Sequence, residues 1–140
     1  MSIDLSKKSS KYLNDLPNEK YSINDYLSST LVASAKIEVV PIQVQYHLSA
    51  SMAQIISSQV GIIFINDENN INKDREIILQ SFELKCRKPI TKTSTDFKLT
   101  LKAKRVTSKS TFYNFEFEFG NKNFCGKMTL ILPCNKKFIL

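Results

Sequence analysis

A stretch of 28 consecutive residues without Asp, Glu, Lys or Arg, from Val39 to Asn66, constrains the fold of this chain most strongly. In a protein that is 24% charged, such a stretch has to be buried. It is too polar to cross a bilayer, which needs about 20 mostly apolar residues, because Pro41, His47, four glutamines and four serines interrupt it. We therefore expect a core element of a globular domain.

This stretch divides into an expected strand and an expected helix. Residues 36–48 have the composition of a strand, and residues 49–65 are apolar nearly all round, which is typical of a helix enclosed by its own protein. The segment 66–76 is dense in Asn and charge, which predicts a surface loop or a helix terminus. The pattern predicts a helix wrapped by a sheet.

The second half of the chain has the alternation of antiparallel strands. Apolar residues take every second position in residues 97–103, in 113–119 and in 124–132. Residues 120–123 read Gly-Asn-Lys-Asn, which predicts a turn and therefore a hairpin. We expect Glu116 and Glu118 to face lysines on neighbouring strands, which is a structural role.

The remaining segments complete a domain with at least five strands. One strand is expected at 77–88. Residues 1–30 are expected to form an N-terminal extension with a short helix around 23–29, capped by Ser22. Residues 31–140 are expected to form the single domain of the chain.

The order strand, long buried helix and four antiparallel strands predicts an α+β protein. It is the order of the hot-dog fold, in which a curved antiparallel sheet wraps around one long central helix. Because an open sheet has edges that can pair with a second copy, we expect a homodimer.

Cysteine and histidine are too few and too scattered to build a structural site. Cys86, Cys125 and Cys134 are odd in number and lack CxxC spacing, and His47 is the only histidine. Neither a disulfide framework nor a metal site is supported, and the sequence favours a reducing compartment. The N-terminus has no apolar run of signal-peptide length, so we expect the protein in the cytoplasm.

Positive charge is concentrated in the second half. Residues 71–140 hold fifteen Lys or Arg and six Asp or Glu, a net charge of +9. This favours an anionic partner, which can be nucleic acid, an acidic carrier protein or the phosphates of a coenzyme. Only three arginines and the lack of an exposed aromatic pattern argue against nucleic acid. The candidate phosphate or carrier contacts are Lys85, Arg87, Lys88, Lys92 and Arg105.

Four short motifs carry a resemblance to a known family. They are His47-Leu48-Ser49-Ala50, Gln59 nine residues after Ala50, Arg87-Lys88-Pro89-Ile90, and an apolar strand ending at Leu130 to Pro133. Over about residues 36–133 the chain resembles the FcoT-like thioesterase family, hot-dog enzymes that hydrolyse long-chain fatty acyl-CoA. Two positions depart from the family pattern, since Ser49 replaces an asparagine and Pro41 replaces a tyrosine.

The resemblance implies thioester hydrolysis at the start of the helix. Hydrolysis needs an oxyanion site, a positioned water and a proton acceptor. The N–H groups around Ala50 and Ser51 are expected to polarise the carbonyl, because first-turn N–H groups lack intrahelical acceptors and lie at the positive end of the dipole. His47 is the candidate base, Ser49 the candidate water ligand, and Gln59 the candidate for positioning a carbonyl. The structural alternatives are a satisfied polar histidine and a serine that only caps the helix.

Three functions stay open at this point. The expected function is hydrolysis of a fatty acyl-CoA or acyl-carrier thioester, with Arg87 and Lys88 on the phosphates or the carrier. No cofactor is expected, since coenzyme A or phosphopantetheine would arrive with the substrate. The alternative is an acyl-CoA or acyl-carrier binding protein without turnover, because Pro41 and Ser49 stand at altered positions. A hydroxyacyl thioester dehydratase is the third, and Ala50 stands where its helix would carry an acid.

Overall fold

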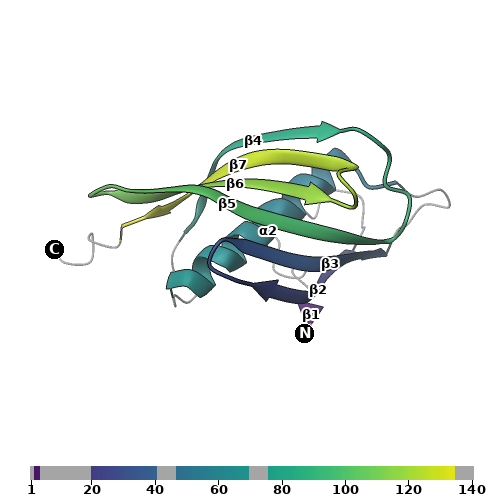
Figure 1. Cartoon of the computed structure of the whole chain (residues 1–140), viewed down its shortest axis with the longest axis horizontal. Coiled ribbons are helices and arrows are strands. Elements are labelled where there is room, and N and C mark those ends of the chain that lie inside the picture. The colour runs from purple at the N-terminus through teal and green to yellow at the C-terminus, as the bar shows by residue number, and fades with distance from the viewer. Residues whose placement is uncertain (1, 4–19, 41–46, 70–75, 135–140) are drawn as a thin grey trace.

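A computed structural model describes residues 2–3, 20–40, 47–69 and 76–134. These residues form one helix and one sheet, whose elements are β1 (Ser2–Ile3), β2 (Lys20–Ser28), β3 (Val32–Val40), α2 (Ala50–Asn69), β4 (Ile78–Cys86), β5 (Ser94–Val106), β6 (Ser110–Phe119) and β7 (Phe124–Pro133). The strands are antiparallel in the order β1-β2-β3-β5-β6-β7-β4. Figure 1 shows the sheet curving around α2, so the expected helix wrapped by a sheet is confirmed.

The core lies between α2 and the inner face of the sheet. One side of α2 is buried at positions three or four residues apart, from Met52 to Ile65. Phe64 packs edge-on against Phe115 of β6, with 5.5 Å between ring centroids. A Cβ at Gly61 would overlap the side chain of Leu130, so the glycine allows α2 to approach β7 closely.

A second glycine allows β7 to pair closely with β4, the strand at the end of the sheet. Gly126 of β7 lies between Phe117 on one side and Leu84 on the other. The ring of Phe117 stacks on Phe82 of β4 at 5.3 Å between centroids. Because a Cβ at Gly126 would overlap both this ring and the carbonyl oxygen of Glu83, only glycine fits here.

The predicted hairpin and its neighbouring strand are confirmed. The inner residues of β5, β6 and β7 are almost all buried, and the turn lies at residues 120–123. In the observed register Lys98 lies opposite Glu118, and Glu116 lies opposite Lys127. The charged atoms of these cross-strand pairs are more than 4 Å apart. The one ion pair within 4 Å among the described residues joins Lys104 to Glu68. The strand predicted at 77–88 is also present, as β4.

The short helix predicted around residues 23–29 is wrong. This segment belongs to β2, which pairs with β3 and buries Tyr21 and Ile23 on the inner face. A bulge follows Asn24, where Asp25 has a φ of 52°. The domain therefore includes β2, and its sheet extends across the boundary expected at residue 30.

The strand expected over residues 36–48 also needs correction. β3 begins earlier, at Val32, and ends at Val40. Residues 41–46, including Pro41, lie outside the described part of the chain, and Leu48 is in no strand. The observed start is earlier because Ala33 and Ala35 are inner-face residues, buried like Ile37.

The helix is longer than predicted. It continues past residue 65 to Asn69, whose side-chain amide donates to the carbonyl of Ile65 at 2.7 Å and to the hydroxyl of Tyr113 at 2.9 Å. No helix within the described residues is both long and apolar enough to cross a membrane.

Candidate active site at the start of the helix

Ser49 is the N-cap of α2. Its hydroxyl oxygen accepts a hydrogen bond from the N–H of Met52 at 3.1 Å, and its carbonyl accepts from the N–H of Ala53 at 3.0 Å. A serine oxygen bonded to the third helical N–H is the usual capping geometry. The structural role considered for Ser49 is therefore present, and within the described part of the chain its hydroxyl donates to no acceptor.

The next two N–H groups are available to a ligand. The N–H groups of Ala50 and Ser51 make no hydrogen bond to other described residues, and both residues are exposed. His47, three residues before Ala50, is exposed as well. Two free donors at the positive end of a 20-residue helix can bind a carboxylate, a phosphate or a polarised carbonyl oxygen.

A backbone hydrogen bond ties this helix start to the connection between β4 and β5. The N–H of Leu48 donates to the carbonyl of Ile90 at 2.8 Å, and both side chains are buried. The same connection is held on its other side, where the N–H groups of Arg87 and Lys88 donate to the carbonyl of Asn123. Residues 87–90, which carry one of the basic motifs, therefore lie next to residues 47–50.

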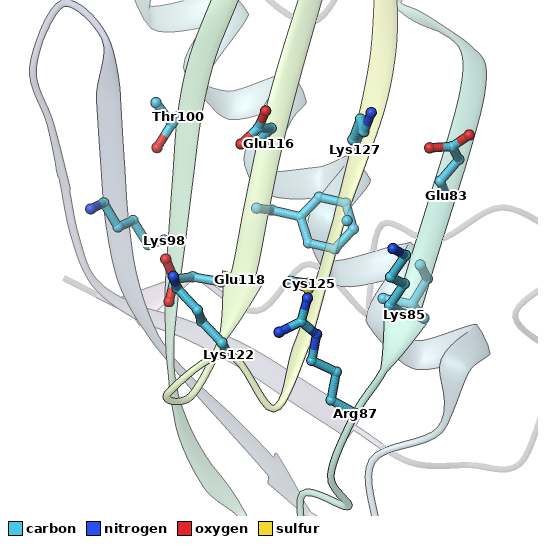
Figure 2. A pocket seen from close by; sticks show the side chains of 13 residues that line it. Glu83, Lys85, Arg87, Lys98, Thr100, Glu116, Glu118, Lys122, Cys125 and Lys127 are labelled. Atoms are coloured by element: carbon cyan, nitrogen blue, oxygen red, sulfur yellow. The ribbon is translucent and has the colours of Figure 1, made fainter.

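Arg87 is nevertheless directed away from the helix. Its side chain lines an open hollow of about 570 Å³ on the outer face of the sheet, which Figure 2 shows from close by. In that view the guanidinium of Arg87 lies over Cys125 and near Lys85. Lys88 is exposed and is not part of this hollow.

The outer-face hollow has a mixed charge. Three carboxylates and five cationic side chains line it, namely Glu83, Glu116, Glu118, Lys85, Arg87, Lys98, Lys122 and Lys127. No pair among them lies within 4 Å, since the ion pair found in the described residues is elsewhere. Such alternation is typical of the solvated face of a sheet, and it explains these charges without a ligand.

Gln59 is not close to the helix start within one chain. It lies nine residues after Ala50, which is about 14 Å along the axis and two and a half turns around it. Gln59 is half-buried, and so are Ile55 and Ile62, which lie on the same side of α2 by helical spacing and pack against the edge of the core.

The carboxylates closest to α2 are at its opposite end. No acidic residue lies between Ala50 and Asn66, and Glu68 pairs with Lys104. The hydrogen bond that Lys104 donates to the carboxylate of Glu68 is the main cause that raises the pKa of Lys104. Burial is the main cause that raises the pKa of Tyr26, and the charge of Asp67 adds to it. These groups are about one helix length from His47, so they do not take part in chemistry at the helix start of the same chain.

Sequence reasoning identified the N-cap and the free N–H groups, but it missed the contact between Leu48 and Ile90. No local pattern predicts that contact, because it joins backbones 42 residues apart. The signal that was available is Ile90 itself, an apolar residue in an otherwise polar connection.

Comparison with known proteins identifies the architecture. No family model matches the chain, and no curated protein matches it. Solved structures do match, and they include the dehydratase heterocomplex ApeI:P from Xenorhabdus doucetiae, at 16% identity over 84% of this chain and 86% of that one, with a TM-score of 0.61. A putative thioesterase from Shewanella oneidensis matches at 13% identity over 93% of this chain and 92% of that one, with a TM-score of 0.58. The chain has the hot-dog fold.

A third match is a thioesterase variant from Pseudomonas aeruginosa, at 8% identity over 92% of this chain and 90% of that one, with a TM-score of 0.58. Identities this low establish the fold and leave the activity open. The likeness to the FcoT-like family likewise stays a prediction, since no family model matches. Both thioesterases and a dehydratase have this hot-dog architecture, so activity has to be argued from the side chains at the helix start.

Proposed function

We propose that this hot-dog protein binds an acyl thioester at the start of α2 and hydrolyses it. The observation that carries the proposal is the pair of N–H groups at Ala50 and Ser51, which make no hydrogen bond to other described residues and lie three and four residues after the exposed His47. A thioester carbonyl placed there gains two donors at the positive end of the helix dipole, where the oxyanion develops. His47 is then the proposed base for the attacking water.

We assign the anionic end of the substrate to the connection that follows β4. The tie between Leu48 and Ile90 supports this, because it places the backbone of Lys88 near the helix start. Phosphates of coenzyme A or phosphopantetheine are the proposed partners of Lys88. Arg87 is left out, because its side chain lies on the outer face of the sheet.

We assign the acyl chain to the side of α2 that carries Ile55, Gln59 and Ile62. These residues are half-buried, and two of them are apolar. Gln59 then contacts the acyl chain of the substrate or a second copy of the protein. It is too far from Ala50 for both residues to contact the same thioester carbonyl. An Ile62→Trp change is expected to shift the preferred acyl length to shorter chains.

Release of free thiol from acyl-CoA of short, medium and long chain length tests the proposed hydrolysis. His47→Ala is expected to lower kcat by at least about 100-fold if the histidine is the base. Lys88→Ala is expected to raise KM, with Arg87→Ala as its matched control, which leaves KM unchanged. Unchanged turnover in His47→Ala would overturn the proposed base.

One observation favours binding without turnover as the second candidate. α2 carries no carboxylate before Asp67, and between Val39 and Asn66 the only ionisable side chains are the imidazole of His47 and the phenol of Tyr46. If the protein releases no thiol from acyl-CoA, but its Tm rises when acyl-CoA is added, it is a binding protein without turnover. The same lack of a carboxylate argues against a dehydratase.

We also propose that β4 pairs with β4 of a second copy. Among the described strands β4 pairs only with β7, and its nine residues contain no proline. The other end of the sheet is β1, which is only two residues long. Light scattering is expected to give twice the chain mass of 16.0 kDa, and a single-chain mass would contradict the dimer.

A further inference from the structure

The β5–β6 arm, residues 102–112, extends beyond the rest of the molecule. It consists of the end of β5, the turn at residues 107–109 and the start of β6. Every residue from Lys102 to Lys109 is exposed. Figure 1 shows the arm projecting at the left, past the C-terminal end of α2.

The arm itself carries only positive charge, and two carboxylates of α2, Asp67 and Glu68, line a hollow at its base with Lys102 and Lys104. No Asp or Glu occurs between Asp96 and Glu116. The arm itself carries Lys102, Lys104, Arg105 and Lys109. Lys104 is paired with Glu68, and the other three have no carboxylate within 4 Å among the described residues.

Apolar side chains are exposed at the same end of the molecule. Val106, next to the turn, is 70% exposed. Leu27, near the end of β2, is 71% exposed, and Leu31, on the turn between β2 and β3, is 54% exposed. This turn lies at the base of the arm, because the N–H of Leu101 donates to the carbonyl of Leu31 at 2.7 Å.

The opposite end of β3 supplies a contrast. Val40 is also 67% exposed, but the described residues around it do not form a basic, acid-free segment. Exposed aliphatic side chains and unpaired cations thus coincide at the arm and not at Val40. At the base of the turn, the N–H of Cys134 donates to the carbonyl of Lys109, so the end of β7 is tied to the arm.

We propose that the β5–β6 arm docks on the surface of an anionic lipid bilayer. Cations within a Debye length of such a surface are attracted to it, and an exposed aliphatic tip gains by entering the headgroup region. The inference goes beyond thioester chemistry and does not depend on it. It adds a location, the lipid surface into which long acyl chains partition.

A nucleic acid fits the arm less well. Binding to single strands uses aromatic rings as stacking platforms. The one aromatic side chain of the arm, Phe112, is half-buried and lies under the guanidinium of Arg105 at 4.5 Å. Val106, Leu27 and Leu31 have no counterpart in a nucleic acid, whereas a bilayer accommodates them.

Co-sedimentation of the full chain with vesicles tests the proposal. Vesicles of phosphatidylcholine mixed with phosphatidylglycerol are expected to bind it, and vesicles of phosphatidylcholine alone are expected to bind it far more weakly. Arg105→Gln with Lys109→Gln is expected to weaken binding by about 25-fold, since each charge near the surface contributes about fivefold. Val106→Asp is expected to weaken it as well, and high salt is expected to weaken binding of the unchanged chain.

Matched controls separate a docking surface from general charge. Val40→Asp removes an equally exposed valine from the other end, and Lys98→Gln with Lys127→Gln removes two cations from the outer face. All variants are checked for an unchanged Tm. Equal loss in the control and arm variants would overturn the proposal, as would equal binding to both kinds of vesicle. Displacement from vesicles by an oligonucleotide at equal charge concentration would assign the arm to nucleic acid instead.

Discussion

The two ends of α2 are held in different ways. At the C-terminal end, three side chains bind the helix to the sheet, since Asn69 donates to Tyr113, Glu68 pairs with Lys104, and Phe64 packs on Phe115. At the N-terminal end, the cap is formed by Ser49 of the same segment, and the tie to the rest of the domain is the backbone bond between Leu48 and Ile90.

The difference separates structural polar groups from available ones. At the C-terminal end the side chains of Asn69 and Tyr113 pair with each other, as do those of Glu68 and Lys104, and these pairs add stability. At the N-terminal end the N–H groups of Ala50 and Ser51 are exposed and have no acceptor among the residues that the structure describes. A scaffold that fixes one end of a helix can leave the other end open for chemistry.

Phe64→Ala tests the fixed end with the largest expected effect. Phe64 is 4% exposed, and its removal leaves a cavity against Phe115. We expect a loss of about 3–5 kcal/mol in the free energy of unfolding. Urea unfolding measures it, and Gln54→Ala, at an exposed position near the open end, is expected to stay within about 0.5 kcal/mol. A loss as small for Phe64 as for Gln54 would remove the contrast between the two ends.

Asn69→Ala tests the polar part of the same end. The change leaves the hydroxyl of Tyr113, a fully buried residue, without the amide of Asn69. We expect a loss of about 1–3 kcal/mol. In a double-mutant cycle with Tyr113→Phe, the second change should add little once Asn69 is gone. Additive losses would mean that the two side chains are not coupled.

Ser49→Ala tests the open end. Loss of the bond from the Met52 N–H is expected to lower stability by about 1 kcal/mol. Ser49→Asn, which keeps a capping oxygen, is expected to retain stability. Thermal unfolding and thiol release should be measured on the same preparations. If Ser49→Asn is as stable as the unchanged protein but has lost turnover, the hydroxyl of Ser49 has a role in the chemistry beyond the cap.

The contacts at the C-terminal end of α2 should also lose stability at alkaline pH. Burial raises the pKa of Tyr26, and the bond to Glu68 raises that of Lys104. A raised pKa in the folded state gives stability that is fully present below the unfolded pKa, 10.0 for tyrosine, and is lost as the pH rises through the folded pKa. We therefore expect the Tm of the unchanged protein to fall above about pH 10. The Tm of Tyr26→Phe is expected to fall less steeply over the same range. Parallel pH profiles for the two proteins would exclude Tyr26 as a cause.

The sequence predicted the regular parts of the sheet well. The alternation holds along β6 and β7 and in β5 as far as Leu101, where the register shifts and Ala103 is exposed, and Gly120 at a φ of 63° provides the turn that the Gly-Asn-Lys-Asn run predicted. β2 was missed because the bulge after Asn24 interrupts the period of two. Ile23, Tyr26 and Leu27 are then spaced i, i+3 and i+4, which imitates a helix.

The candidate site was predictable only where it is local. The N-cap at Ser49 follows from its neighbours in the sequence, and so do the free N–H groups after it. The direction of Arg87 does not, because the register of β4 against β7 decides which face of the sheet it joins. The distance of Gln59 from Ala50 follows from helical geometry alone.

The position of β4 has a consequence for biosynthesis. β4 precedes β5 and β6 in the chain, yet its partner in the sheet is β7, and Phe124 follows Cys86 by 38 residues. When α2 and β4 leave the ribosome, the strand that covers Gly61 and pairs with β4 has not been made. The apolar surfaces of the helix and β4 that β7 covers therefore stay uncovered until β7 has been made, and during this interval the chain is most exposed to aggregation.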